Sequence, residues 1–238
     1  MPSGRAVRRV RSAIGSLSAP IDLSHPIDAA TPPFPGDPPV EVRILDASSV
    51  RTPDGRRHVN LSQVVLGLHV GTHMDAPYHF VDSAATIDQV ALDACIGPCA
   101  LVDLPGFDRG GAIESRHLEP HGERLRAARR AILRTGWEKR WKTPGYFEEH
   151  PVLSKGAARF LVDSGLLLVG ADMPSVDRPP HEAHLELLGR GIVIVENLTN
   201  LGALPEAPFW IAALPLRVAG RDGSPVRAVA FPGAEPGP

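Results

Sequence analysis

The segment HVGTHMDAPYHF, residues 69–80, brings together several side chains that can bind a metal ion. They are His69, His73, Asp75 and His79. The whole chain has 238 residues and only 10 histidines, so three of them in so short a stretch are unlikely by chance. Imidazole nitrogen and carboxylate oxygen are ligands that zinc and manganese accept. The segment therefore predicts a metal site rather than a set of surface or core histidines.

The local conformation of this segment can be predicted from its glycine and proline. His69 and His73 are four residues apart and could share one face of a helix. Gly71 and Pro77 instead favour an irregular turn, because glycine lets the backbone bend and proline interrupts regular hydrogen bonding. In such a turn several side chains can converge on one ion.

A second group of possible ligands lies more than 100 residues further on. His184 belongs to the predicted helix HEAHLELL, and Glu196 follows the apolar run IVIV. A carboxylate at the end of a buried strand is costly unless it meets a cation. One helix–turn–strand unit can bring His184 and Glu196 together. The alternatives are an exposed His184 and a structural salt bridge for Glu196.

Together these residues suffice for a centre of two metal ions if one carboxylate bridges them. The predicted ligands are His69, His73, Asp75, His184 and Glu196. A metal ion lowers the pKa of a bound water to about 7, which supplies hydroxide at neutral pH. His79 would remain unligated, and a free histidine beside such a centre is suited to general acid–base catalysis.

The order of predicted elements indicates a mixed α/β domain. Strands are expected at residues 40–45, 60–68, 100–102, 131–134, 166–169, 192–195, 210–218 and 226–231, and helices at 115–125, 154–163 and 181–188. Strands outnumber helices, yet strand–helix–strand units recur in the second half.

Composition limits the partners of the protein. A net charge of −2 gives no basic surface for nucleic acid, and no apolar run approaches the roughly 18 residues that span a bilayer. Cys95 and Cys99 are expected to be small apolar residues near a buried strand, which fits a reducing cytoplasm. Residues 1–18 carry four arginines and are expected to form a flexible basic arm, or an arm that packs on a neighbouring subunit. Residues 19–238 are expected to form one domain that acts on a small molecule.

The twelve residues quoted above resemble the signature HxGTHxDxPxH of the cyclase family, which includes bacterial kynurenine formamidases and isatin hydrolases. Further landmarks are FPGD (34–37), RTGWEKRW (134–141), SVD (175–177), ENLTNL (196–201), ALPLR (213–217) and GSPVRAVA (223–230). The resemblance runs from residue 21 to about residue 231 and is closer to the broad cyclase branch than to the true formamidases.

The resemblance implies a fold, a set of ligands and an oligomeric state. The implied fold is a single α/β domain with a curved mixed sheet or barrel-like core flanked by helices. The implied ligands are the five residues named above, with Asp75 bridging two ions of zinc or manganese and His79 moving protons. Family members assemble as homodimers or homotetramers, in which a neighbouring subunit can complete the pocket.

The expected function is hydrolysis of an amide, lactam or lactone in a small molecule. The alternatives are a lyase or cyclase acting through an enolate, a true arylformamidase, and a metal-storing or ligand-sensing protein without catalysis. A free His79 argues against the last alternative. Phe34 lies in a rigid proline-rich loop, where the formamidases carry tryptophan. Phe34 is expected to stack on or cover a flat substrate. Because phenylalanine replaces tryptophan, hydrolysis of N-formylkynurenine is expected to be weak or absent. The alternative is that Phe34 only anchors the loop to the core.

Overall fold

A computed structural model describes residues 19–45, 53 and 60–233. The predicted N-terminal arm, residues 1–18, lies outside the described residues.

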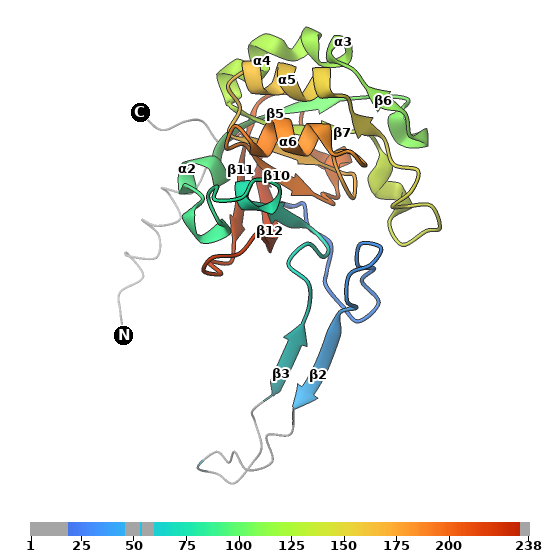
Figure 1. The fold of residues 1–238 in the computed structure, drawn as a ribbon, viewed down its shortest axis with the longest axis vertical. Helices are drawn as coiled ribbons and strands as arrows, with labels where there is room; N and C mark the ends of the chain where they lie inside the picture. Colours follow the sequence, from blue (N-terminus) through green and yellow to red (C-terminus); the bar gives the residue numbers. More distant parts are fainter. Residues whose placement is uncertain (1–18, 46–52, 54–59, 234–238) are drawn as a thin grey trace.

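The body of the protein is a closed barrel of mixed strands (Figure 1). Around the barrel lie β12 (Gly223–Phe231), β11 (Phe209–Pro215), β5 (Ile96–Asp103), β7 (Arg130–Arg134), β9 (Leu168–Ala171), β10 (Val193–Glu196) and β4 (His73–Asp75). The ring closes because residues 226–231 of β12 pair with β11 while residues 223–225 pair with β4. Strands β5, β7, β9 and β10 are parallel, and the other neighbours are antiparallel. The short β1 (Ile21–Asp22) pairs with β12 outside this ring.

Helices cover the parallel strands on the outside of the barrel (Figure 1). They are α3 (Ser115–Leu118), α4 (Gly122–Ala128), α5 (Lys155–Asp163) and α6 (Glu182–Leu188). Successive side chains of a strand point to opposite faces, so Ala131 and Leu133 pack with Leu161 of α5, whereas Ile132 packs with Ile211 in the barrel interior. The predicted α/β domain with a barrel-like core is confirmed.

Shorter elements complete the chain. They are α2 (Leu92–Cys95), the parallel pair β6 (Ala112–Ile113) and β8 (Val152–Leu153), and the 3-10 helices Pro77–His79, Ile87–Gln89, Phe107–Arg109, Glu119–His121, Trp137–Arg140 and Leu201–Ala203. Among the residues that the structure describes, no helix is long and apolar enough to cross a membrane.

Several predicted boundaries were wrong. The helix expected at 115–125 is divided into α3, a 3-10 turn and α4, because Pro120 has no N–H to continue the helical ladder. Strand β5 begins at Ile96 instead of residue 100, since its first half pairs with β11. The helix starting after Ser154 is confirmed, and the Ser154 hydroxyl accepts a hydrogen bond from the Ala157 N–H at 3.1 Å.

The cysteines behave as predicted. Cys95 ends α2 and Cys99 lies in β5, and both are free thiols buried in the barrel core. Burial raises the pKa of both thiols, so they are unreactive.

Two predicted strands form an arm that stands away from the barrel (Figure 1). They are β2 (Glu41–Leu45) and β3 (Leu61–Val65), an antiparallel pair. The second strand ends at Val65, earlier than the predicted residue 68. One face of the arm carries Val42 and Val64, which are cross-strand neighbours, and Ile44. Their exposed fractions are 46%, 51% and 88%, so this apolar face has little cover from the described residues.

Candidate metal centre

The segment 69–80 contributes four side chains to one end of the barrel. His69 lies in the turn before β4, His73 and Asp75 lie on β4, and His79 ends the following 3-10 helix. The expected irregular turn is confirmed only up to Thr72, where Gly71 adopts φ +62°. The prediction was wrong for residues 73–75, because pairing of β4 with both β10 and β12 makes them a strand.

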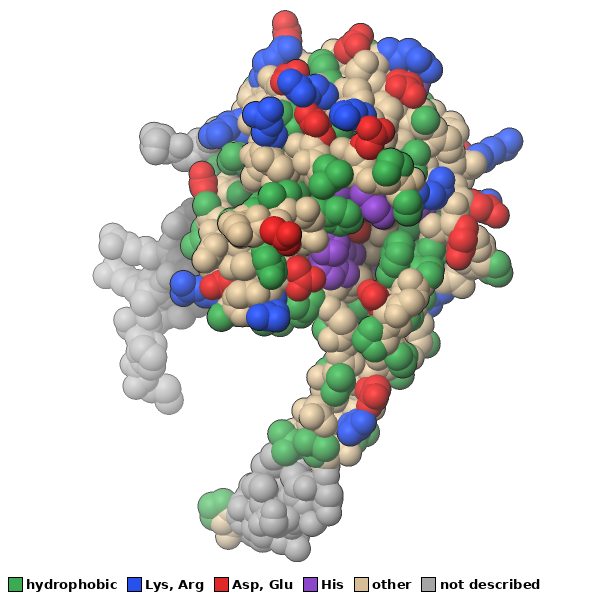
Figure 2. Space-filling model, in the orientation of Figure 1, with side chains coloured by type: hydrophobic (Ala, Val, Ile, Leu, Met, Phe, Trp, Pro, Cys, Tyr) green, Lys and Arg blue, Asp and Glu red, His purple; other side chains and the backbone are tan. Residues whose placement is uncertain are grey.

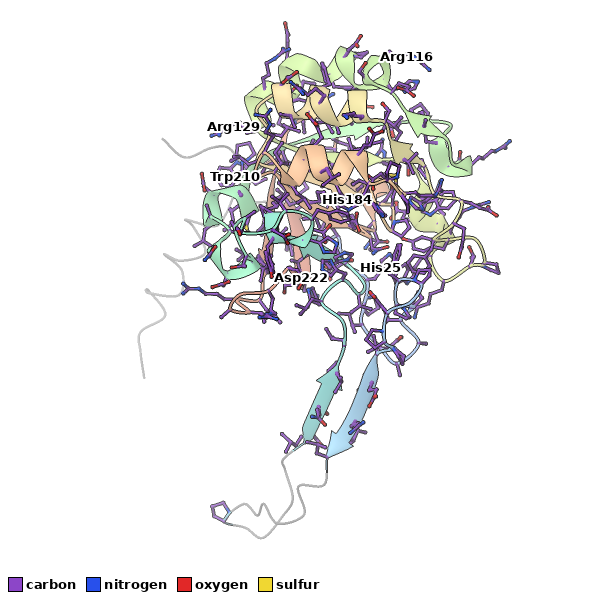
Figure 3. The ribbon with its side chains drawn as sticks, viewed as in Figure 1. His25, Arg116, Arg129, His184, Trp210 and Asp222 are labelled. Atoms are coloured by element: carbon purple, nitrogen blue, oxygen red, sulfur yellow. The ribbon has the colours of Figure 1, made fainter. Side chains whose placement is uncertain are left out.

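The second group of predicted ligands meets the first through this pairing. Glu196, the last residue of β10, is the register partner of His73. His184 reaches the same place from α6, which packs over β10. Figure 3 shows His184 and Asp222 in the region where the arm joins the body. The predicted helix–turn–strand unit therefore does bring His184 and Glu196 together.

Four of the five predicted ligands form a tight buried cluster. His73 Nε2 lies 3.4 Å from Asp75 Oδ1 and 3.4 Å from Glu196 Oε2. His184 Nε2 lies 3.7 Å from Asp75 Oδ2 and 3.5 Å from Glu196 Oε1. Ligand atoms bound tetrahedrally to one ion at 2.0–2.2 Å are about 3.4 Å apart. The cluster thus has the spacing that a divalent ion requires.

An unsatisfied oxygen supports the same conclusion. Asp75 Oδ2 is buried and has no hydrogen-bond partner among the described residues. A buried carboxylate oxygen without a partner is costly, and a cation is the group that would satisfy it. The residues present therefore fit a metal ion.

His69 joins the cluster through direct hydrogen bonds. Its Nδ1 lies 2.7 Å from Asp75 Oδ1, and its Nε2 lies 2.6 Å from Asp222 Oδ2. His69, His73 and Asp75 also lie close enough together to hold an ion. Because 2.7 Å is shorter than the spacing of two ligands, an ion there requires the His69 ring to shift. Asp75 is common to both groups of ligands.

Each of the three histidines among the predicted ligands contacts an acceptor through the ring nitrogen that does not face the cluster. His73 Nδ1 donates to the Gly71 carbonyl at 2.9 Å, and His184 Nδ1 contacts Asp177 Oδ1 at 2.6 Å. Asp222 does the same for His69 Nε2. Histidines that bind metals nearly always donate their second N–H in this way, which fixes the tautomer and aims the other nitrogen at the ion.

The ionisation of the cluster follows from its charges. Burial opposes a charge on His73, but the carboxylates of Asp75 and Glu196 raise the pKa of His73 to about 10. Burial and the Asp75 charge oppose ionisation of Glu196, yet contacts with His184 and His73 lower the pKa of Glu196. The carboxylates stay charged, and a metal ion would displace the proton from His73.

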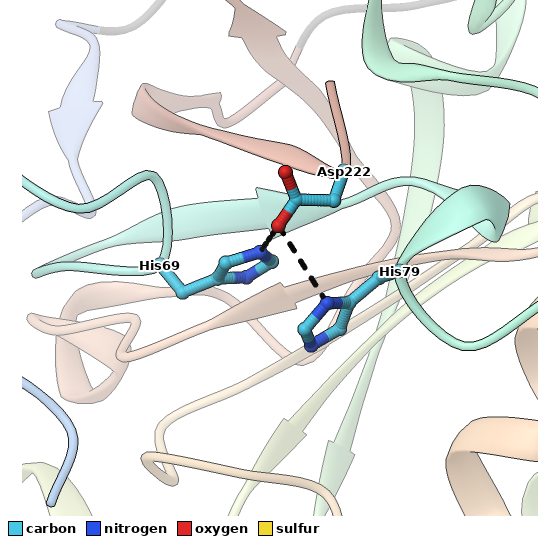
Figure 4. Close-up of side chains that lie close together, drawn as sticks. All are labelled: His69, His79 and Asp222. Carbon is cyan, nitrogen blue, oxygen red and sulfur yellow. Dashed lines mark hydrogen bonds and ion pairs between the residues drawn. The ribbon is translucent and has the colours of Figure 1, made fainter. Parts of the chain in front are cut away.

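His79 differs from the other histidines of the segment. Its ring stacks on His69 with centroids 3.9 Å apart, and its Nδ1 lies 3.8 Å from Asp222 Oδ2 (Figure 4). Burial lowers the pKa of His79, so the ring is neutral at pH 7 and can accept a proton. His79 lines the cavity beside the four-residue cluster but is not one of the four members.

The cavity above the cluster has a volume of about 360 Å³. Figure 2 shows histidine side chains gathered in this hollow. Aromatic side chains form part of its wall: Phe80, Phe147 and Phe34. Phe34 is 39% exposed and meets Phe147 edge to face with ring centroids 5.5 Å apart. Phe34 therefore lies at the mouth of the cavity.

The family model described as a putative cyclase matches residues 21–178. The chain belongs to this family. It is 34% identical over 213 residues to a kynurenine formamidase of Paracidovorax citrulli (strain AAC00-1), covering 87% of this chain and 94% of that protein. It is 33% identical over 217 residues to a kynurenine formamidase of Bacillus cereus (strain ATCC 14579), covering 89% and 97%.

Solved structures share the fold of this cyclase-family chain. An isatin hydrolase bound to the product analogue thioisatinate superposes with a TM-score of 0.80 at 21% identity, covering 98% of this chain and 100% of that one. A potential metal-dependent hydrolase with cyclase activity gives a TM-score of 0.72 at 26% identity, with coverages of 91% and 98%.

All predicted site residues of the cyclase-family chain lie in or beside one cavity, but other residues there were missed. Asp177 and Asp222 hold the rings of His184 and His69, and His181 lines the cavity. The sequence did contain signals for them. Asp177 belongs to the SVD landmark, Asp222 precedes GSPVRAVA, and His181 opens the helix that carries His184.

Proposed function

We propose that this chain is a metal-dependent hydrolase of non-peptide C–N bonds in small molecules, acting on an amide or lactam and in the same manner on a lactone. The observation that carries the proposal is the buried cluster of two carboxylates and two imidazole nitrogens, spaced for an ion at the foot of a cavity. The formamidase relatives support the choice of bond.

The proposed metal centre would hold two ions of zinc or manganese. Asp75, His184 and Glu196 would hold one ion, and His69, His73 and Asp75 would hold the other, so that Asp75 is common to both groups. A divalent metal bound there acidifies a water and polarises the carbonyl of the substrate. The buried carboxylates provide the negative charge that retains such ions.

His79 is the proposed acid–base residue. Its neutral imidazole takes a proton from the attacking water and returns it to the leaving nitrogen. The Asp222 carboxylate faces its Nδ1 and favours the tautomer with the proton on that atom. Nε2 of His79 is then the atom that exchanges protons with the substrate.

Phe34 is the proposed substrate-binding residue. The turn FPGD is closed by a hydrogen bond from the Asp37 N–H to the Phe34 carbonyl at 2.9 Å, with Gly36 at φ +101°. This turn holds the ring beside Phe147 at the mouth of the cavity. Two aromatic rings at the entrance suit a small flat substrate.

A true arylformamidase is the second candidate function. The formamidase names of the two relatives quoted above favour it. The phenylalanine at position 34 argues for weaker binding of N-formylkynurenine, because its face is smaller than that of tryptophan and has no N–H donor.

An activity screen tests the proposal. Zinc-loaded and manganese-loaded protein is mixed with N-formyl anilines, isatin and lactones, and the products are identified by mass spectrometry in water enriched in oxygen-18. Hydrolysis incorporates the label, whereas a lyase or cyclase reaction leaves it out. Glu196→Ala should lose both metal and activity, and Glu123→Ala, an exposed change on α4, should lose neither. Absence of labelled product across the panel would contradict the proposal.

We also propose that the chain self-associates as a homodimer or homotetramer through its arm. A hairpin of two strands is marginal by itself, and the exposed apolar face of Val42, Ile44 and Val64 requires cover. Light scattering should give a multiple of the 25.4 kDa chain mass, and Ile44→Lys should reduce it. A monomeric wild-type protein would contradict this proposal. The cytoplasmic location remains a prediction from cysteine usage.

A further inference from the structure

We propose that His181 binds the substrate by accepting a hydrogen bond from its N–H, so that the site selects secondary amides and lactams over N-alkylated ones and over lactones. This inference rests on the proposed function and adds a residue that determines specificity.

The backbone of His181 is the first observation. His181 occupies the N-cap position of α6 with φ 62° and ψ 40°, the left-handed region that few residues other than glycine adopt. Outliers of this kind cluster at functional sites. The conformation directs the side chain into the wall of the cavity, with its ring centroid 5.1 Å from Phe80 and 5.7 Å from His184.

The second observation is the tautomer. His181 Nδ1 lies 2.9 Å from Asp177 Oδ1, the oxygen that also contacts His184 Nδ1 at 2.6 Å. The other oxygen, Oδ2, accepts from the N–H groups of Ala183 at 2.7 Å and His184 at 3.0 Å. Since a carboxylate can only accept, this contact holds the tautomer of His181 with the proton on Nδ1, and in that tautomer Nε2 has a free lone pair. That Nε2 makes no hydrogen bond within the described part of the chain, so a bound molecule can reach it.

Two alternative roles are less consistent with this geometry. Asp177, His181 and His184 lie close enough to hold a further ion. However, both oxygens of Asp177 already accept hydrogen bonds, whereas Asp75 has a buried oxygen without a partner, so nothing in this group requires a cation. The second alternative is that His181 serves only to donate a hydrogen bond to Asp177. That role does not require its ring to line the cavity, as it does.

Binding of unreactive lactams tests the inference without relying on turnover. The probes are 2-indolinone, which has an N–H, and N-methyl-2-indolinone, which does not. Isothermal calorimetry on the metal-loaded wild-type protein should show roughly five- to tenfold tighter binding of the N–H probe, the usual net effect of one hydrogen bond. In His181→Phe the ratio should fall to about one through loss of affinity for the N–H probe alone, with the metal content unchanged.

Controls separate this role from folding and from the proposed function. Glu182→Ala alters the exposed neighbour that pairs with Lys155 and should keep the wild-type ratio. If His181→Phe does not fold, His181→Asn is the second variant, since asparagine accepts the left-handed backbone. An equal affinity of the wild-type protein for both probes, an unchanged ratio in the His181 variant, or loss of metal from it would overturn the inference. Absence of hydrolysis would contradict the proposed function but would leave this binding ratio measurable.

Discussion

Asp177→Asn tests how a buried carboxylate supports the proposed metal centre. The side chain of Asp177 accepts four hydrogen bonds, two from the backbone at the start of α6 and two from the rings of His181 and His184. Asparagine keeps one oxygen and replaces the other by an NH₂ group, which cannot accept. If the oxygen continues to hold the backbone, the His184 ring loses its acceptor and faces a donor.

The size of the effect follows from these contacts. Loss of a partner that orients a metal-binding histidine lowers metal affinity about 10- to 100-fold, which equals about 1.4–2.7 kcal/mol. Loss of the negative charge at the N-terminus of α6 adds a decrease in the free energy of unfolding of about 0.3–1 kcal/mol in the metal-free protein. Competition with a fluorescent chelator measures the first quantity, and urea unfolding of the metal-free protein measures the second.

The matched control is Asp103→Asn, which removes a surface ion pair with Arg134 away from the cluster. It should leave metal affinity unchanged. A variant at Asp177 that loses stability yet binds metal as tightly as the wild-type protein would show that this carboxylate serves the helix alone, and the argument about His184 would fail.

Other predictions concern the remaining residues of the site. His79→Ala should keep its metal, as measured by elemental analysis, and lose about 10²- to 10⁴-fold in kcat; wild-type turnover would exclude its role as acid–base. Phe34→Ala should raise the KM of the best substrate with little change in metal content, whereas an unchanged KM with a lower Tm would indicate an anchoring role. In Gly223→Ala the new Cβ would lie 2.6 Å from His69 Cε1, so metal loading should fall, and full loading would contradict the close approach. Despite burial, the nearby carboxylates raise the pKa of His73 to about 10 and raise the pKa of His184 and His69 as well, so metal binding at neutral pH displaces more than one proton; affinity should fall by more than about tenfold for each unit that the pH is lowered, and affinity independent of pH between 7 and 8 would contradict this.

The first group of proposed metal ligands, with His79 beside it, could be predicted because its signal is local. His69, His73, Asp75 and His79 are close in sequence, and a turn at Gly71 is sufficient to gather them. The second group could also be predicted, since the helix before a buried strand folds back onto it and carries its histidine to the end of that strand.

The supporting contact of Asp222 could not be predicted because it depends on a distant pairing. Asp222 contacts His69 across 153 positions of the chain, and this contact exists only because β4 pairs with the start of β12. The same pairing makes His73–Asp75 a strand, where the local sequence favours a turn. A single sequence gives no register between strands so far apart.

The arm shows a different limit of prediction. Alternating apolar residues at 40–45 and 60–68 correctly indicated strands, since the pattern is typical of a half-buried sheet. The pattern does not say what covers the apolar face. In the structure, Val42 and Val64 are 46% and 51% exposed, so the described residues leave this face largely uncovered.

The most direct test of the central claim is the number of metal ions bound per chain in Asp75→Asn compared with the wild-type protein. Asparagine has the shape of aspartate but lacks the charge and the second acceptor oxygen with which Asp75 is proposed to bridge the two groups of ligands. After loading with zinc or manganese and dialysis, elemental analysis should find two ions per wild-type chain and almost none in the variant. Equal metal content in the two proteins would contradict a metal centre built on Asp75.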